Sequence, residues 1–196
     1  QTYFFNDTIE TVVFNPSWGV PPSIILNEMM PKILNNPSYL ENSGYEVYDK
    51  SGRVVPSSSV NWRQVASNGG GVGIRQKPSL GNALGELEIL FPNSHDIYMH
   101  DTPAKSYFKK DMRALSHGCI RLERPRDMAA AVLDVPVEEL NQYFGKNERN
   151  VKVKSQLPVY VSYFTAWPDA ATGQIHYYDD VYERDAYLQK AMLKTQ

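Results

Sequence analysis

The chain has 196 residues, of which 42% are hydrophobic and 21% charged, a composition typical of a folded domain with an ordinary core. Its net charge of −2 provides no electrostatic case for nucleic acid or an anionic membrane as a main partner. The longest apolar runs, such as residues 129–133, are far too short to cross a bilayer.

The start of the sequence does not resemble a signal peptide, because Gln1 opens a polar and aromatic stretch. A chain that starts at Gln indicates an excised piece. We therefore expect a full-length precursor to carry an export signal or membrane anchor. The chain contains one cysteine, Cys119, which excludes an internal disulfide. A lone cysteine is usually a small buried hydrophobic residue, so its neighbours must decide whether it is reactive.

The first half of the chain predicts short elements separated by breaks. The 13 tyrosines and 13 prolines together favour a β-rich fold with long loops. Residues 11–15 predict a strand, and residues 15–22 interrupt regular structure with three prolines and a glycine. Residues 23–34 have helical spacing, with Ser23 as the N-cap and Pro31 expected to bend or end the helix. Small strands are expected over residues 45–60, with a turn at Ser51-Gly52.

Residues 23–70 are expected to form a small inserted subdomain that contains helix. Its apolar residues favour a packed unit over an irregular loop, and the glycine-rich residues 68–73 are expected to be its return hinge. Residues 1–22 and 71–196 then form the main domain. The glycines do not indicate a phosphate-binding loop, since neither Gly-Lys-Ser/Thr nor G-x-G-x-x-G in a strand-to-helix setting is present.

The second half predicts strands at residues 85–91 and 96–100, joined by the turn Pro92-Asn93-Ser94. Strand alternation then places Tyr98 and His100 on the same face. Short helices are expected at residues 124–133 and 137–144, and a terminal helix at residues 184–193. Residues 151–154, 159–164 and 174–178 predict further strands, the last two separated by a turn that contains Thr172-Gly173.

The segment most indicative of chemistry is Ser116-His117-Gly118-Cys119-Ile120-Arg121. A cysteine becomes a useful nucleophile when its thiolate is populated and exposed beside a histidine or another cation. Gly118 permits a tight turn whose backbone N–H groups can face a developing oxyanion. Arg121 adds positive potential if the segment is extended. A buried cysteine in a tight turn, with Arg121 as a surface charge, explains the local pattern equally well.

Either His117 or His100 is a candidate base for Cys119. His100 closes a predicted strand, which is a rigid element suited to holding a catalytic group. A zinc site fits poorly, because one cysteine with scattered histidines lacks paired ligands at short spacing, so we expect neither a metal nor another cofactor. Serine catalysis is disfavoured by the absence of G-x-S-x-G. Asp101 and Asp111 are candidate partners for a histidine, although a plain loop position is the simpler interpretation of each.

His100 followed by Ser116-His117-Gly118-Cys119-Ile120-Arg121 resembles the active-site signature of the L,D-transpeptidases. Flanking segments also resemble this family, and residues 15–22 are similar to its larger Gram-negative subtype, which carries a capping subdomain. The resemblance covers nearly the whole chain. The flanking segments that carry this resemblance are Asn15-Pro16-x-Trp18-x-Val20-Pro21-Pro22, Asn82-Ala83-Leu84-Gly85, Phe91-Pro92-Asn93, Tyr98-Met99-His100-Asp101-Thr102-Pro103 and Arg113-Ala114-Leu115.

The resemblance implies a mainly β fold, with a β-sandwich-like catalytic core, short peripheral helices and a small α-containing capping insertion. The implied partners are peptidoglycan stem peptides, as donor and as acceptor. The enzyme attacks the carbonyl of the third stem residue, usually meso-diaminopimelate, and expels the terminal D-Ala. A second diaminopimelate amine captures the thioester and gives a 3→3 cross-link. Carbapenem β-lactams are implied covalent inhibitors. A monomer in the periplasm is expected, with no nucleic acid partner.

The resemblance also implies residue roles. Cys119 is the nucleophile and His100 its base. The N–H groups of Gly118 and Cys119 are the oxyanion donors, with the Tyr98 hydroxyl as a third. His117 and Arg121 are expected to bind stem carboxylates. Ser116 and Trp18 are further candidate substrate contacts, although packing is the stronger expectation for Trp18.

Two other functions remain open at this point. A hydrolase with the same site releases D-Ala or cuts an existing cross-link, and differs only in whether water or an amine reaches the thioester. A non-catalytic wall-binding module is the alternative of another class. Binding alone requires neither His100 nor Cys119, so their joint presence argues against the module.

Overall fold

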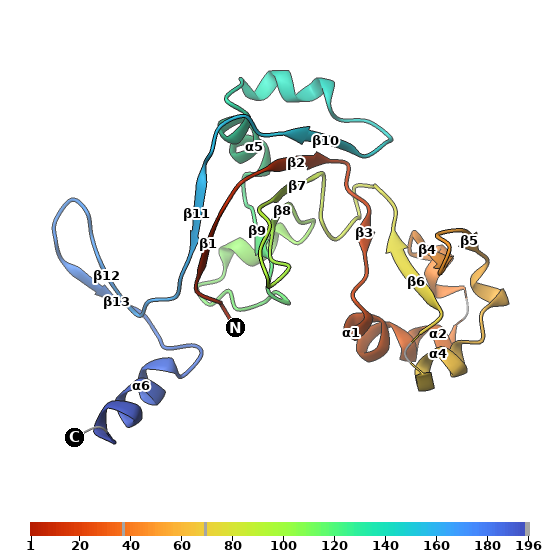
Figure 1. The fold of residues 1–196 in the computed structure, drawn as a ribbon, viewed down its shortest axis with the longest axis horizontal. Helices are drawn as coiled ribbons and strands as arrows, with labels where there is room; N and C mark the ends of the chain where they lie inside the picture. Colours follow the sequence, from red (N-terminus) through yellow and green to blue (C-terminus); the bar gives the residue numbers. More distant parts are fainter. Residues whose placement is uncertain (37, 69, 195–196) are drawn as a thin grey trace.

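The computed structural model describes residues 1–36, 38–68 and 70–194. Its fold is mainly β, with several small sheets and short helices, as the sequence predicted. Figure 1 shows a central unit, a second unit to one side and a C-terminal extension to the other. Within the described ranges, no helix is both long and apolar enough to cross a membrane.

The central unit is built on a five-stranded sheet in the order β10-β2-β7-β8-β9. Neighbouring strands run antiparallel except for β8 and β9, which are parallel. All four residues of β2 are buried, because strands flank it on both sides and the core covers it. The strands are β2 (Thr11–Phe14), β7 (Leu87–Leu90), β8 (Met99–His100), β9 (Ile120–Arg121) and β10 (Arg149–Lys152).

One hydrophobic cluster joins this sheet to the helices α5 (Pro125–Leu133) and η4 (Val137–Gln142). Phe14, Leu87 and Ile89 from the sheet are fully buried in it, together with Ala129 of α5 and Leu140 of η4. Pro125 lies in the first turn of α5, where its missing N–H costs no helical hydrogen bond. The cluster fixes the sheet that carries the catalytic candidates.

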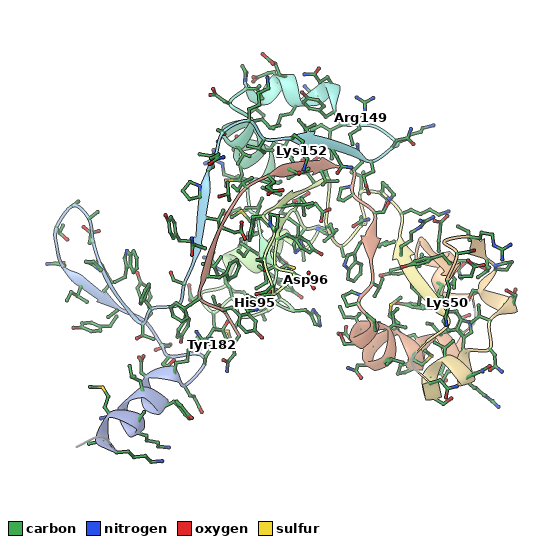
Figure 2. All side chains as sticks on the ribbon, in the orientation of Figure 1. Lys50, His95, Asp96, Arg149, Lys152 and Tyr182 are labelled. Carbon is green, nitrogen blue, oxygen red and sulfur yellow. The ribbon has the colours of Figure 1, made fainter. Side chains whose placement is uncertain are left out.

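A two-stranded ribbon of β1 (Phe5–Thr8) and β11 (Pro158–Val161) leaves the sheet toward the C-terminal extension. The extension contains the hairpin β12 (Ala166–Pro168) and β13 (Ile175–Tyr177), followed by α6 (Arg184–Leu193). Tyr182, labelled in Figure 2, joins the extension to the N-terminal residues through its hydroxyl, which lies 3.3 Å from Thr2 Oγ1.

The second unit has its own sheet, in the order β3-β6-β4-β5, and its own hydrophobic cluster. Ile33, Leu40 and Ile74 are the most deeply buried members of that cluster. The sheet contains β3 (Trp18–Gly19), β4 (Tyr45–Asp49), β5 (Val54–Val55) and β6 (Val72–Gln76). Its helices are α1 (Pro22–Ile24), η1 (Ile25–Met29), α2 (Met30–Asn35), α3 (Tyr39–Asn42), η2 (Ser57–Ser59) and α4 (Trp62–Asn68).

This unit extends beyond residues 23–70 at both ends, because β3 and β6 are hydrogen-bonded strands of its sheet. We therefore call residues 18–76 the cap unit. Of the glycines expected to form a hinge, Gly69 lies outside the described residues. Gly73 lies within β6, and a Cβ at this position would collide with the ring of Tyr48. The structure explains Gly73 by this close approach of an aromatic ring.

The helix expected over residues 23–34 forms as α1, η1 and α2, with a π-helical turn in the middle. Ser23 is not its N-cap, since Pro21 occupies the capping position and Ser23 lies inside α1. Pro31 does not end the helix either. It lies in the first turn of α2, directly after the π turn, where an N–H is not required.

The strand expected at residues 96–100 is only Met99–His100. The side chain of Asn93 explains this, because its Nδ2 donates to the carbonyls of Phe91 and Ile97 and stabilises a loop between them. Asp96 adopts a φ of 52°, which interrupts an extended strand. The helix expected at residues 137–144 is the shorter 3₁₀ helix η4.

Candidate active site

The parallel pairing of β8 with β9 brings the two main candidates to one edge of the sheet. Ile120 N–H donates to the Tyr98 carbonyl at 2.9 Å, and Leu122 N–H donates to the His100 carbonyl at 2.8 Å. Met99 is the register partner of Ile120, so Cys119 lies level with Tyr98, one residue earlier on each strand. Strand alternation then directs the side chains of Tyr98, His100 and Cys119 to the same face.

His100 is held in the orientation that a base requires. It is 7% exposed, and its Nδ1 forms a short hydrogen bond with the carbonyl of Asp101. Donation by Nδ1–H leaves the lone pair of the neutral ring on Nε2. Burial lowers the pKa of His100, and the charge of Arg121 contributes to the same direction. His100 is therefore neutral near neutral pH and able to accept a proton.

Cys119 is a free, partly buried thiol. Burial raises its pKa, while hydrogen bonds from the backbone and hydroxyl of Tyr98 act in the opposite direction. Burial also raises the pKa of Tyr98, so this hydroxyl remains a donor. The thiol lies 3.9 Å from the carbonyl of Asp96, which belongs to the loop before β8 (Figure 2). No direct Cys119–His100 hydrogen bond is found within the described ranges, so that pairing stays a prediction.

Gly118 makes the turn that presents Cys119. Its φ is +133°, a conformation that residues with a side chain rarely adopt, and a Cβ there would meet open space. Glycine is favoured at this position by the backbone conformation alone, since an added Cβ would collide with no neighbouring atom. Gly118 N–H donates to Ser116 Oγ at 3.2 Å, so an oxyanion would have to replace this hydroxyl. Ser116 thus stabilises the resting turn.

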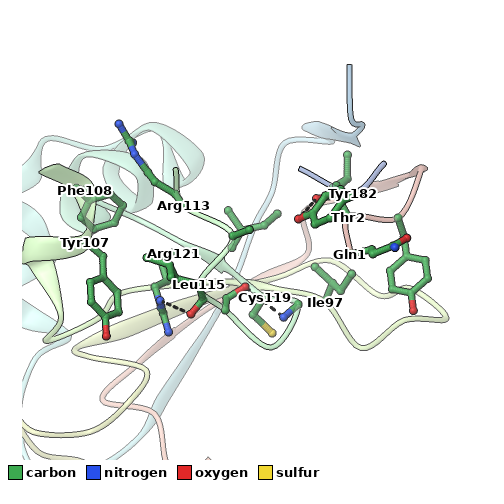
Figure 3. Close-up of a pocket in the computed structure, with 16 residues that line it drawn as sticks. Gln1, Thr2, Ile97, Tyr107, Phe108, Arg113, Leu115, Cys119, Arg121 and Tyr182 are labelled. Atoms are coloured by element: carbon green, nitrogen blue, oxygen red, sulfur yellow. Dashed lines mark hydrogen bonds between the residues drawn. The ribbon is translucent and has the colours of Figure 1, made fainter. Parts of the chain in front are cut away.

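A pocket of about 360 Å³ opens at Cys119 (Figure 3). The segment that carries Cys119 forms one wall, and Thr2 with Tyr182 forms another. Arg113 and Arg121 also line it, and none of the described lining residues is acidic. The pocket therefore favours a ligand that carries carboxylates.

Arg121 also holds the loop that precedes Cys119. Its Nη1 donates to the Leu115 carbonyl at 3.1 Å, and its guanidinium lies 5.4 Å from the centre of the Tyr107 ring (Figure 3). A cation over an aromatic face is stabilised by the ring quadrupole. Arg121 thus connects the wall of the pocket to β9, the strand that follows Cys119.

His117 and Trp18 do not line this pocket. His117 Nε2 is 2.8 Å from Glu28 Oε1, which joins the Cys119 loop to η1 of the cap unit. This contact places the cap unit beside the candidate nucleophile. Trp18 pairs with Gln76 in the cap sheet and packs against the cluster of the cap unit. Trp18 therefore makes packing contacts in this structure, as expected for it.

Lys105 was not identified from the sequence. Its Nζ lies 2.6 Å from Asp101 Oδ1 and donates to the carbonyls of Leu122 and Glu123 at 3.2 and 3.0 Å. The other carboxylate oxygen of Asp101 accepts from Glu86 N–H at 3.0 Å. Lys105 therefore connects the residues that follow β8 with those that follow β9. The only hint in the sequence was the charged residue four positions after Asp101.

Glu88 was also not identified from the sequence. It is the direct register partner of His100 on the neighbouring strand β7, so the two side chains share one face of the sheet. Burial, and then the charge of Glu148, raise the pKa of Glu88 to about 7. Its charge in turn raises the pKa values of Tyr98 and Cys119. Nothing in the sequence around Glu88 indicates that its pKa is raised, because the shift depends on burial in the folded sheet.

The described residues include no group of three His, Cys, Asp or Glu side chains placed to hold a metal ion. The chemistry available at the site is that of a thiol, an oriented neutral imidazole, a phenol and backbone N–H groups. Such an arrangement is suited to acyl transfer through a covalent intermediate.

Residues 1–161 match the model of the YkuD L,D-transpeptidase catalytic domain. The chain belongs to this family. The match ends at Val161, the last residue of β11, so the β12–β13 hairpin and α6 lie beyond it.

A candidate L,D-transpeptidase of Haemophilus influenzae (strain Rd) is 30% identical to the chain over 188 residues. The similarity covers 93% of this chain but 37% of that protein. The chain thus spans little more than a third of the length of the curated relative that it matches.

Proposed function

We propose that this protein is a cysteine acyltransferase that forms 3→3 cross-links between peptidoglycan stem peptides. The observation that carries the proposal is the parallel pairing of β8 and β9, which aligns Tyr98 and His100 with Cys119, itself a lining residue of a pocket. The donor is a tetrapeptide stem, and its carboxylates bind beside Arg113 and Arg121 in that pocket. The acceptor is the side-chain amine of diaminopimelate in a second stem.

In the first half-reaction, His100 Nε2 takes the proton of the Cys119 thiol as sulfur attacks the diaminopimelate carbonyl. Both groups start neutral, which agrees with the lowered pKa of His100 and the raised pKa of Cys119. The developing oxyanion accepts hydrogen bonds from Cys119 N–H, from Gly118 N–H after it leaves Ser116, and from the Tyr98 hydroxyl. His100 then protonates the leaving amine of D-Ala, and a thioester remains.

In the second half-reaction, the acceptor amine attacks the thioester carbonyl and the carbon–sulfur bond breaks. One proton of the amine passes through His100 to the departing sulfur, which restores the thiol and the neutral imidazole. Water in place of the amine gives a tripeptide and defines the hydrolase alternative. The two outcomes differ only in which nucleophile reaches the thioester.

The test is incubation with disaccharide-tetrapeptide, followed by chromatography and mass analysis of the muropeptides. We expect D-Ala release and a dimer linked through two diaminopimelate residues, and we expect Cys119→Ala to abolish both. Dimer formation by Cys119→Ala would refute the thioester. Tripeptide with no dimer would assign the protein to the hydrolases, and no change in the muropeptides would favour the non-catalytic module.

The choice of base has its own test. His100→Ala should slow alkylation of the Cys119 thiol near neutral pH, because Nε2 no longer takes its proton. His117→Ala should leave alkylation close to the wild-type rate. The reverse pattern would assign the base to His117.

Carbapenems are proposed to acylate Cys119, since a strained lactam carbonyl is open to the same sulfur. Intact-protein mass spectrometry should show one adduct on the wild type and none on Cys119→Ala. We also propose that the enzyme works in the periplasm, where its wall substrate lies, and that it is a monomer. A full-length precursor with neither an export signal nor a membrane anchor would count against that compartment.

A further inference from the structure

Charge is distributed unequally around Cys119. The pocket on one side is lined by Arg113 and Arg121 and by no acidic residue among those described. On the side of the cap unit, the Cys119 loop instead contacts a carboxylate, Glu28, through His117. Both stems of the proposed reaction carry carboxylates and a diaminopimelate amine, but only the acceptor must bring that amine, an ammonium group in solution, to the thioester.

The position of Glu28 follows from the π-helical turn η1. Ile25 and Met29 are buried in the cap cluster, so Glu28, one residue before Met29, is directed away from it. π-Helical turns inside α-helices are frequent at functional sites because they redirect individual side chains. Here the turn directs Glu28 toward a loop 89 residues later in the sequence.

The contact leaves Glu28 able to bind a cation. His117 Nε2 meets only Oε1, at 2.8 Å, and no hydrogen bond to Oε2 is found in the described parts of the chain. The Glu28 side chain is 51% exposed and that of His117 is 68% exposed, so solvent reaches both. His117 is two residues from Cys119, a separation of at most about 7 Å along the backbone. His117 therefore brings the carboxylate to the loop that carries Cys119.

We propose that Glu28 is the acceptor subsite of this protein and that it binds the ammonium group of the incoming stem on the cap side of Cys119. His117 is its positioning residue. The inference rests on the proposed transpeptidase function and deepens it. The donor enters from the arginine side and the acceptor enters from the Glu28 side. The bound ammonium releases one proton to solvent at this exposed carboxylate, and the neutral amine then attacks the thioester. It also assigns His117 a different role from binding stem carboxylates.

Glu28→Gln tests the charge alone, because the amide oxygen still accepts a hydrogen bond from His117. The donor is tetrapeptide at a fixed concentration, and the acceptor is a tripeptide stem at varied concentration. We expect the acceptor KM to rise about three- to fivefold, at the upper end of the range of exposed charge pairs, with the rate of D-Ala release unchanged. The fraction of thioester lost to water should rise accordingly. Glu28→Lys should raise the acceptor KM further.

Three controls separate this effect from others. Glu41→Gln removes another exposed carboxylate of the cap unit and should leave the acceptor KM unchanged. Hydroxylamine is largely uncharged near neutral pH, so its capture of the thioester should not depend on Glu28. High salt should reduce the difference between wild type and Glu28→Gln, since the Debye length falls to about 3 Å at 1 M.

An acceptor KM in Glu28→Gln within twofold of wild type, with normal D-Ala release, would overturn the subsite and leave the proposed function intact. Equal losses with hydroxylamine and with the stem acceptor would also overturn it, because the damage would then lie at the thioester. A wild type that releases no D-Ala would instead overturn the proposed function, and the subsite with it.

Discussion

Glu88→Gln is the sharpest test of the electrostatics around Cys119, the proposed nucleophile. Glu88 lies on β7 opposite His100 and is partly buried. Burial raises its pKa from an ordinary 4.5 to about 7. The native protein therefore binds the Glu88 proton more tightly than the unfolded chain does. Glutamine resembles the protonated acid in shape and hydrogen bonding, so the substitution removes the charge and little else.

The magnitude follows from linkage. The native and unfolded pKa values differ by about 2.5, which corresponds to about 3 kcal/mol in the free energy of unfolding. Protonated Glu88 contributes its full stability below pH 4.5, and this contribution is lost as the pH rises through about 7. Glu88→Gln should therefore match the wild type at pH 4.5 and exceed its stability by about 2 to 3 kcal/mol at pH 8.5.

Urea unfolding at the two pH values measures this difference, with Glu123→Gln as an exposed control. Thiol alkylation provides an independent readout. The charge of Glu88 raises the pKa of Cys119, so the glutamine variant should react faster above pH 7. A stability difference that is the same at both pH values would refute the reasoning, because a change in packing does not titrate.

Three further substitutions test the supports of the site. Gly85→Ala should destabilise the protein by about 2 to 4 kcal/mol in urea, because φ is +61° and the new Cβ would collide with Asp101; a smaller loss would show that the turn relaxes. Lys105→Met should slow carbapenem acylation of Cys119 about tenfold, because Asp101 loses its ion pair. An unchanged rate would show that β8 and β9 keep their register without Lys105. Asn82→Ala should cost about 2 to 4 kcal/mol, because its buried Nδ2 donates to three carbonyls; near-wild-type stability would mean that water replaces the amide.

The sequence alone determined those features that depend on neighbouring residues, such as single turns, short helices and the β-rich class. The turn at Gly118 could be predicted because glycine next to a cysteine needs no partner elsewhere in the chain to adopt φ of +133°. The helix with Pro125 in its first turn and the β-rich class were likewise set by local propensity and spacing. The pairing of Cys119 with a distant histidine was inferred from the family resemblance, because spacing alone left His100 and His117 open.

Only the tertiary structure decided what surrounds Cys119. Thr2 and Tyr182 are 180 residues apart and meet at the pocket, and Glu28 meets His117 across 89 residues. Glu88 acquires its raised pKa only when neighbouring strands remove it from water. Side-chain periodicity specifies which face of an element is buried, but not which distant element covers that face. Those contacts depend on how the two hydrophobic clusters pack, and packing is a property of the whole chain.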